Sequence, residues 1–233
     1  MQRIFITGAN RGIGLELARQ TLLRGDRVFA AARQPENAID LQELKAIYGD
    51  QLTIVRLEVT NQAEIDTAVE QVRKEADGLD VLINNAGMLP PTDSLDSLEA
   101  DTILKTLEVN SVAPLMISKA FMGLLQNGTE AKIVNISSQA GSLSARRVWE
   151  GRYSYSASKS ALNMLSKTLA AEVEKDGISV VIIHPGWVST DMGGSAAPVT
   201  PPESAAGILQ VLDNLTLKDT ARFFAWDGTE VPW

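Results

Sequence analysis

Two side chains, Tyr155 and Lys159, combine residue types and a spacing that suit proton transfer. They are four positions apart, so in a helix both side chains would share one face and lie within mutual reach. An ordinary tyrosine, with a pKa of about 10, is a weak acid–base catalyst near neutrality. A neighbouring ammonium stabilises the phenolate, so we expect Lys159 to lower the pKa of Tyr155. Tyr153 is the rival proton donor, but Ala157, four positions after it, carries no charge.

A serine that could hold the reacting oxygen follows a strand-like run at residues 132–136. Ser138 lies just beyond this run, and ligands of open α/β sheets bind at the carboxyl ends of the strands. There a hydroxyl would stabilise negative charge that develops on a substrate oxygen. Ser137 is an alternative for this role, whereas Ser142 is disfavoured because it lies outside the strand-end motif.

The remaining inventory of reactive side chains excludes other chemistries. The 233 residues contain no cysteine and one histidine, His184. This excludes thiolate nucleophiles, disulfides and metal sites built from cysteines or paired histidines, and we expect no metal. A hydrolase based on Ser138 is disfavoured, since the chain lacks the Gly-x-Ser-x-Gly elbow and has no second histidine to serve as the base. We expect His184 to be a structural residue at a strand end.

A glycine-rich turn near the N-terminus is suited to binding a phosphate. Glycines allow the backbone to turn tightly and to approach a ligand, and the free N–H groups at the start of the next helix attract an anion. Such a turn after the first strand of a βαβ unit is where dinucleotides bind, and the alternative is a tight turn that holds no ligand. The turn reads Thr7-Gly8-Ala9-Asn10-Arg11-Gly12-Ile13-Gly14.

Short apolar runs alternate with longer amphipathic stretches along the chain. Consecutive apolar residues such as Ile4, Phe5 and Ile6 are typical of strands buried on both faces. Seven strands alternating with helices predict a single α/β domain over residues 1–233, a Rossmann-type doubly wound parallel sheet with helices on both faces. The predicted strands span residues 3–7, 27–32, 52–57, 81–84, 132–136, 179–183 and 222–224, and the predicted helices span residues 13–23, 40–48, 62–76, 100–125, 155–173 and 202–215.

Six motifs in order give the chain a resemblance to the short-chain dehydrogenase/reductase family. The glycine turn matches the family fingerprint Thr-Gly-x-x-x-Gly-x-Gly, and the resemblance covers nearly the whole chain. Residues 226–233 and the short length are similar to the subgroup that contains the C-factor signalling protein and the sniffer-type carbonyl reductases. The other five motifs are Asn84-Asn85-Ala86-Gly87, Asn110, Asn135-Ile136-Ser137-Ser138, Tyr155-x-x-x-Lys159 and Pro185-Gly186.

The resemblance implies an NADPH-dependent oxidoreductase of the carbonyl reductase or alcohol dehydrogenase type. Hydride then passes to a ketone, aldehyde or quinone, Tyr155 protonates the oxygen, Ser138 positions it, and Lys159 holds the nicotinamide ribose while tuning Tyr155. Asn110 is expected to hold a water that relays protons to Lys159. The alternative is that Asn110 is only a buried amide within its helix. Ser138 precedes Tyr155 by 155 − 138 = 17 residues, longer than is usual in the family, so the extra length falls within residues 143–152.

In this family, residues at the end of the second strand recognise the adenine ribose of the nicotinamide cofactor. Ala32 stands where NAD-preferring members carry Asp, and Arg33 offers a bidentate partner to a 2′-phosphate, with Arg11 as a second charge. We therefore expect NADP(H) to be preferred over NAD(H), the alternative being that Arg33 only solvates a strand end. Glu58 stands where members usually place Asp beside the adenine. The expected cofactor contacts are Gly8, Asn10, Arg11, Gly12, Ile13, Gly14, Arg33, Glu58, Val59, Asn85, Ala86, Gly87, Tyr155, Lys159, Pro185, Gly186, Val188 and Thr190.

Substrate recognition is expected in three segments, at residues 88–94, at residues 143–152 and in a lid at residues 192–202 that closes over the substrate. A quinone, an aldehyde, a diketone and a steroid-like ketone all stay open as substrates. Apolar side chains in or beside these segments favour a medium-sized or aromatic carbonyl compound. Arginines there could bind an anionic group, although solvation of the arginines is favoured. These side chains are Trp149, Trp187, Met192, Arg146, Arg147 and Arg152.

Charge and hydropathy limit the partners. The 21 basic and 29 acidic residues give a net charge of −8, which argues against a nucleic-acid partner. No apolar run approaches the roughly 18 residues that span a bilayer, and no leader is recognisable, so we expect no membrane partner and a cytoplasmic location.

Family members pair through the helices at residues 100–125 and 155–173, so a homodimer or homotetramer is expected. A second hypothesis is a C-factor-like intercellular signalling or interaction protein on a dehydrogenase scaffold, which the intact catalytic positions disfavour.

Overall fold

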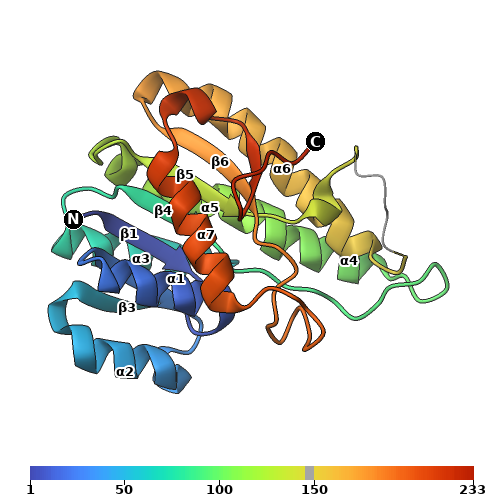
Figure 1. The fold of residues 1–233 in the computed structure, drawn as a ribbon, viewed down its shortest axis with the longest axis horizontal. Helices are drawn as coiled ribbons and strands as arrows, with labels where there is room; N and C mark the ends of the chain where they lie inside the picture. Colours follow the sequence, from blue (N-terminus) through green and yellow to red (C-terminus); the bar gives the residue numbers. More distant parts are fainter. Residues whose placement is uncertain (145–149) are drawn as a thin grey trace.

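The chain forms one seven-stranded parallel sheet. The computed structural model describes residues 1–144 and 150–233. The strand order is β3-β2-β1-β4-β5-β6-β7, and every neighbouring pair is parallel. This confirms the predicted doubly wound fold (Figure 1). The strands are β1 (Arg3–Thr7), β2 (Arg27–Ala32), β3 (Leu52–Arg56), β4 (Val81–Asn84), β5 (Lys132–Ile136), β6 (Ser179–His184) and β7 (Phe223–Ala225).

Helices cover both faces of the sheet because each parallel pair needs a crossover connection. Helices α1, α2 and α7 pack on one face, and helices α3, α5 and α6 pack on the other. No helix in the described part of the chain is long and apolar enough to cross a membrane. The helices are α1 (Gly12–Leu23), α2 (Ile39–Tyr48), α3 (Gln62–Glu75), α4 (Ala100–Leu107), α5 (Ala113–Gln126), α6 (Tyr153–Val173) and α7 (Pro201–Asn214).

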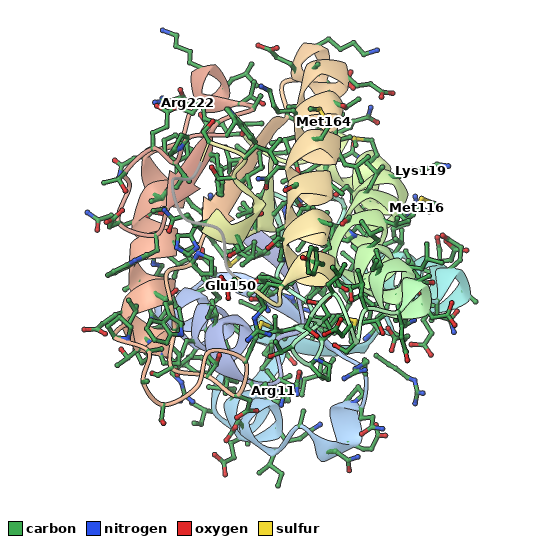
Figure 2. All side chains as sticks on the ribbon, turned by 90° about the vertical axis from the view of Figure 1, so that its right-hand side faces the viewer. Arg11, Met116, Lys119, Glu150, Met164 and Arg222 are labelled. Carbon is green, nitrogen blue, oxygen red and sulfur yellow. The ribbon has the colours of Figure 1, made fainter. Side chains whose placement is uncertain are left out.

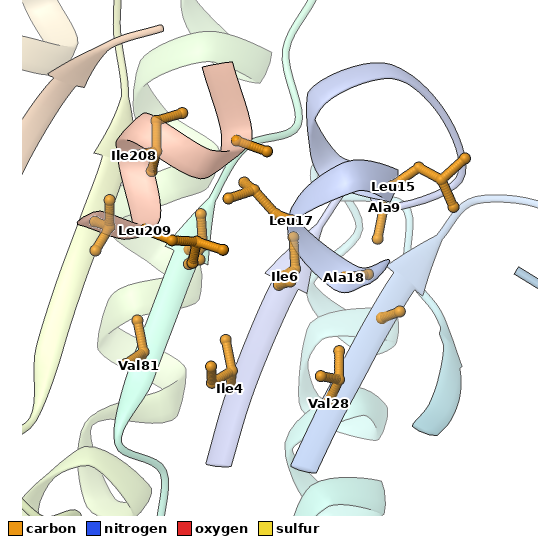
Figure 3. Packing of buried hydrophobic residues seen from close by; sticks show 14 of the residues in the cluster. Ile4, Ile6, Ala9, Leu15, Leu17, Ala18, Val28, Val81, Ile208 and Leu209 are labelled. Atoms are coloured by element: carbon orange, nitrogen blue, oxygen red, sulfur yellow. The ribbon is translucent and has the colours of Figure 1, made fainter. Parts of the chain in front are cut away.

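The central strands are apolar on both sides, as their consecutive apolar residues predict. Ile4 and Ile6 of β1 lie in the core on the side of α1 and α7, in the same cluster as Leu17 and Ile208 (Figure 3). Phe5, between them in the sequence, faces the other side of the sheet and belongs to the core under α3, α5 and α6. Such burial on two faces fixes the strand register, and with it the place where each strand ends.

One predicted helix differs in a way that concerns the site. The single helix expected at residues 100–125 is divided into α4 and α5 by a π-helical turn over Glu108–Val112. The turn lies where Asn110 is directed at the loop after β4. Single π turns of this kind interrupt helices most often at functional sites. The remaining predicted elements match the observed ones with their ends displaced by one or two residues.

The segment proposed from the sequence as a lid is shorter than expected. Helix α7 begins at Pro201, and Thr200 caps it, so the segment before the helix is residues 192–200. Val199 pairs with Val188 in a parallel bridge. The N–H of Ser189 donates to the carbonyl oxygen of Val199 at 2.8 Å. The end of this segment nearest α7 is therefore tied to the loop after β6.

The last residues return toward the segment after β5. The N–H of Ser144 donates to a backbone oxygen of Trp233 at 2.7 Å. The hydroxyl of Ser142 donates to the carbonyl oxygen of Pro232 at 2.6 Å. The ring of Trp233 lies 5.7 Å from that of Phe223 in β7. These contacts fasten residues 142–144 to the far edge of the sheet.

Candidate active site

The expected site residues meet at the carboxyl ends of β1, β4, β5 and β6. Strand order reverses between β1 and β4, since the chain runs from β1 outward to β3 and then returns to β4. In open α/β sheets the crevice at such a reversal is where ligands bind. Arg11 precedes α1 and Glu150 precedes α6, and Figure 2 places both at this end of the molecule.

The glycine turn is shaped so that a side chain at its last glycine would not fit. A Cβ atom on Gly14 would lie 2.3 Å from the carbonyl oxygen of Gly8 and 2.5 Å from Nδ2 of Asn85. Gly12 has a φ of +56°, which favours glycine. Arg11, the N-cap of α1, makes no side-chain capping bond, and the first turn carries no acidic residue. The first N–H groups and the positive end of α1 can therefore serve a phosphate, so this turn fits a dinucleotide.

The loop after β4 is fastened to this turn. The backbone N–H groups of Asn85 and Ala86 both donate to Oγ1 of Thr7 at 3.0 Å. The side-chain amide of Asn85 donates to the carbonyl oxygens of Thr7 and Gly8, at 2.9 and 3.0 Å. The Asn85 side chain thus joins the ends of β1 and β4, and Ala86 packs on the glycine turn, where a Cβ on Gly8 would lie 2.9 Å from its Cα.

Helix α6 carries both Tyr155 and Lys159 to the end of β5. Lys159 is only 5% exposed, and its Nζ donates to the carbonyl oxygen of Ile136 at 2.9 Å. The same Nζ lies 5.8 Å from the centre of the Tyr155 ring. Burial penalises the charged form and lowers the pKa of Lys159 to about 8. The amine is therefore charged at neutral pH and loses its proton just above it.

The expected lowering of the tyrosine pKa is wrong for this structure. Burial raises the pKa of Tyr155 above its ordinary value, and this is the largest influence on it. A hydrogen bond with Ser138 and the positive charge of Arg152 act in the opposite direction and do not compensate. Because the phenolate is costly in a poorly solvated position, Tyr155 holds its proton at neutral pH.

The rival serines and the rival tyrosine are engaged elsewhere. Ser137 donates its hydroxyl to Oδ1 of Asn163 at 2.6 Å within the core, and Ser142 bonds the C-terminal segment. Tyr153 is 50% exposed at the start of α6. Ser138 is the serine that acts on the pKa of Tyr155, despite the long separation between them in the sequence.

The amide of Asn110 is bonded to the loop after β4 and to α6. Its Oδ1 accepts from the N–H of Met88 at 2.8 Å, and its Nδ2 donates to the carbonyl oxygen of Met88 and to Oγ of Ser158, at 2.9 and 3.0 Å. A Cβ on Gly87 would lie 3.3 Å from Oδ1 of Asn110 and 3.8 Å from Nζ of Lys159. Asn110 therefore borders the lysine, and its oxygen keeps one lone pair for a further donor.

The arginines expected at the adenine end are exposed and paired with carboxylates. Nη1 of Arg33 lies 3.8 Å from Oε2 of Glu58, and the Arg33 side chain is 73% exposed. Nη1 of Arg11 lies 2.6 Å from Oδ2 of Asp191. Such surface pairs contribute little stability, so either guanidinium can exchange its partner for a phosphate. Val59 is buried beside Glu58.

The loop after β6 borders the glycine turn. A Cβ on Gly12 would lie 3.2 Å from Cγ2 of Thr190, so the end of the loop that holds Pro185, Gly186 and Val188 lies beside the glycine turn. His184 ends β6, and its Nδ1 is buried with no partner among the described residues. Burial lowers the pKa of His184 to about 4. The imidazole is therefore neutral near pH 7, as a structural residue would be.

One residue near the site has no local signal in the sequence. Asp93 is 4% exposed, and its Oδ2 accepts from the N–H of Ser154 at 2.7 Å and from the Ser154 hydroxyl. Burial raises its pKa, but the hydrogen bonds from Ser154 outweigh burial and leave the pKa lowered. Arg152, the N-cap of α6, makes no side-chain capping bond. Asp93 therefore caps the catalytic helix from 61 residues away.

Two expectations concern the rest of the site. Within residues 1–144 and 150–233, no cluster of His, Asp and Glu is suited to holding a metal ion. Arg146, Arg147 and Trp149, considered for substrate binding, lie outside the described residues. Trp187 and Met192 are exposed, and Nε1 of Trp187 donates to the carbonyl oxygen of Gly193 at 2.8 Å.

Comparison with known proteins agrees with this geometry. Residues 2–199 match the family model described as short chain dehydrogenase. An NADPH-bound carbonyl reductase from chicken fatty liver superposes with a TM-score of 0.95 at 38% identity, over 100% of this chain and 99% of the other. The carbonyl reductase Sniffer of D. melanogaster gives 0.95 at 34% identity over 100% of both chains. The C-signal protein of Myxococcus xanthus is 38% identical over 155 residues, 66% of this chain and 93% of that protein. The chain belongs to the short-chain dehydrogenase family.

Proposed function

We propose that this protein is an NADPH-dependent carbonyl reductase that acts on a ketone, aldehyde or quinone. The observation that carries the proposal is the buried Lys159 amine beside Tyr155, with Ser138 close enough to the same phenol to lower its pKa. These groups lie at the strand ends next to a glycine turn that fits a dinucleotide. The likeness to two carbonyl reductases, one of them with NADPH bound, supports the same function.

NADPH would be held along the whole carboxyl edge of the sheet. When bound, the cofactor supplies the hydride. The glycine turn and the N-terminus of α1 would bind the pyrophosphate, and Arg33 with Arg11 would bind the 2′-phosphate. Lys159 would hold the nicotinamide ribose, and the backbone from Pro185 to Val188 with Thr190 would border the nicotinamide.

Proton transfer falls to the side chains of α6 and of the loop after β5. Tyr155 is protonated at neutral pH because burial raises its pKa, so it can donate to the carbonyl oxygen. Ser138 donates a hydrogen bond to the same oxygen and stabilises the charge that develops there. The phenolate that remains is stabilised by the ammonium of Lys159. Asn110 keeps an acceptor free beside that ammonium, which suits a water that returns the proton.

A panel of ketones, aldehydes and quinones with NADPH tests the proposal. We expect turnover of at least one compound and a fall in kcat of roughly 10²- to 10⁴-fold for Tyr155→Phe, with NADPH binding unchanged. Tyr153→Phe is the matched control, since that ring is half exposed and has no place in the mechanism. Near-normal turnover by Tyr155→Phe would overturn the assignment of the proton donor.

A signalling role is the second candidate, and the likeness to C-signal is what favours it. The same panel separates the two functions. Tight NADPH binding without reduction of any compound would support a protein that uses the dehydrogenase fold for signalling. Turnover that depends on Tyr155 supports the enzyme.

The proposal includes pairing between copies of the chain. Leu104 on α4, Val112 in the π turn and Met164 on α6 are exposed apolar side chains. Figure 2 shows Met164 on α6 and Met116 on the neighbouring helix α5. A homodimer or homotetramer formed through these helices would cover them. Sedimentation of Met164→Glu against the unchanged protein tests this, and an unaltered oligomeric state would contradict it.

A cytoplasmic location and closure of residues 192–200 over the substrate stay predictions.

A further inference from the structure

Arg152 lies between two segments that border the reacting groups. It directly precedes α6, three residues before Tyr155, and its side chain is half-buried. Its backbone pairs with Asp93 in a parallel bridge, and its Nη1 lies 3.5 Å from the carbonyl oxygen of Pro90. Figure 2 marks the neighbourhood by Glu150, at the foot of α6. The guanidinium is therefore held between the start of the catalytic helix and the loop after β4.

Arg152 differs from every other arginine that the structure describes. Each of the others has a carboxylate oxygen within 4.0 Å, whereas Arg152 has none among the described residues. Residues 145–149 are Ala, Arg, Arg, Val and Trp, so they contain no carboxylate that could pair with it. Asp93 makes no ion pair with it either: Oδ2 of Asp93 accepts from the N–H and the hydroxyl of Ser154, and Oδ1 is buried with no hydrogen-bond partner among the described residues. Among the described arginines, Arg152 is therefore set apart by having no counter-charge within 4.0 Å.

The positive charge of Arg152 is felt at the reacting phenol. It is one of two influences that lower the pKa of Tyr155 against burial. The carbonyl of the substrate accepts the proton of Tyr155. An unpaired guanidinium near Tyr155 can therefore bind a second functional group of the same substrate. Its planar fork matches a carboxylate with two parallel hydrogen bonds, and partial burial strengthens such a pair.

We propose that Arg152 binds a carboxylate on the substrate, so that the enzyme prefers carbonyl compounds that also carry a carboxylate. The inference rests on the proposed carbonyl reductase function and narrows its substrate class. The carboxylate would supply the counter-charge that the protein does not provide. Neutral carbonyl compounds would still be reduced by Tyr155 and Ser138, but they would bind more weakly.

The test compares acids with their neutral methyl esters. The pairs are 4-formylbenzoate, 3-formylbenzoate and benzoylformate, each with its methyl ester, reduced by the protein with NADPH. We expect kcat/KM for the acid to exceed that for the ester by roughly 10- to 100-fold in at least one pair, mainly through KM. Arg152→Gln should remove this preference, and Arg152→Lys should keep part of it. Because both members of a pair use the same Tyr155, their ratio cancels any change in the phenol.

Arg56→Gln is the matched control, since Arg56 is 64% exposed on β3 and paired with Glu64. It should keep the full preference. NADPH affinity and melting temperature show whether each variant is folded. An unchanged acid-to-ester ratio in folded Arg152→Gln and Arg152→Lys would overturn the inference, as would a protein that reduces neutral carbonyls but prefers none of the acids. Failure to reduce any carbonyl compound, ester or acid, would instead overturn the proposed function on which the inference rests.

Discussion

The two halves of the sheet hold their functional groups in different ways. The cofactor half consists of β1, β2 and β3 with α1 and α2, and the catalytic half consists of β4, β5 and β6 with α4, α5 and α6. In the cofactor half, Arg11 and Arg33 lie exposed on loops and few polar side chains are buried. In the catalytic half the buried polar side chains include Asn84, Asp93, Asn110, Ser111, Ser118, Asn135, Ser137, Ser154, Ser158, Lys159, Asn163 and Ser166.

The buried polar groups of the catalytic half form a connected path from the sheet to α6. Nδ2 of Asn84 donates to Oδ1 of Asn135 at 2.8 Å, and Nδ2 of Asn135 donates to Oγ of Ser166 at 2.7 Å. Directional bonds of this kind fix the helix relative to the strands more narrowly than apolar contact alone. Proton transfer needs such fixed distances, whereas a phosphate can be attracted by flexible surface charge. The difference between the halves therefore follows the difference between their tasks.

The largest predicted effect concerns Lys159 in the catalytic half. Its buried amine is needed for catalysis but lowers the stability of the fold. Lys159→Met should lower kcat by roughly 10²- to 10⁴-fold, because the phenolate loses its cation. The same change should raise the free energy of unfolding at pH 7 by up to about 3 kcal/mol, because burial lowers the lysine pKa from 10.5 to about 8 and each pKa unit corresponds to about 1.4 kcal/mol. Denaturant unfolding and steady-state kinetics measure the two effects.

The pH dependence of the stability gained by Lys159→Met shows whether the gain comes from removing a buried charge or from better apolar packing. Between pH 8 and 10.5 the unfolded chain still binds the lysine proton and the native chain does not, so the unchanged protein becomes more stable as pH rises. The advantage of Lys159→Met should therefore shrink over this range. A variant that is less stable than the unchanged protein at pH 7 would show that the amine stabilises the catalytic half.

A second prediction concerns His184, at the border of the catalytic half. Burial holds its pKa at about 4, so below pH 6.5 the unfolded chain takes up a proton that the native chain does not. Stability should fall by about 3 kcal/mol as pH decreases from 6.5 to 4. His184→Gln should remove this part of the loss, as measured by unfolding at several pH values. Asp80, whose pKa is lowered against burial mainly by Arg3, acts at lower pH and equally in both proteins, whereas Asp227 interacts with His184 and also loses stabilisation only at lower pH. Parallel stability curves for the two proteins would refute this account of His184.

The positions of the site residues could be predicted because they follow from strand order. Consecutive apolar residues place the strands, and parallel strands bring their carboxyl ends to one edge. Ser138 and the glycine turn therefore lie together, although 124 residues separate Ser138 from Gly14, by subtraction of their numbers. The doubly wound fold follows from the same pattern.

Three features could not be predicted, because they depend on contacts distant in the sequence. The π turn at Asn110 leaves the apolar pattern of the helix unchanged, so periodicity does not reveal it. The cap that Asp93 gives to α6 comes from another loop, whereas sequence rules detect only local caps. The direction of the pKa shift of Tyr155 was predicted from one neighbouring charge, but burial, which only the folded chain defines, decides it.

The smallest predicted effect lies in the cofactor half and should leave stability untouched. Arg33→Ala should lower the preference for NADPH over NADH by about tenfold, the loss of about 1.4 kcal/mol expected for one exposed charged contact. The change should alter the free energy of unfolding by less than about 0.5 kcal/mol, because the pair with Glu58 is long and exposed. Arg56→Ala, on the next strand, should change neither quantity. Cofactor specificity and denaturant unfolding are the measurements. A large loss of stability in Arg33→Ala would mean that the cofactor half, like the catalytic half, uses the hydrogen bonds of its polar side chains to hold the fold.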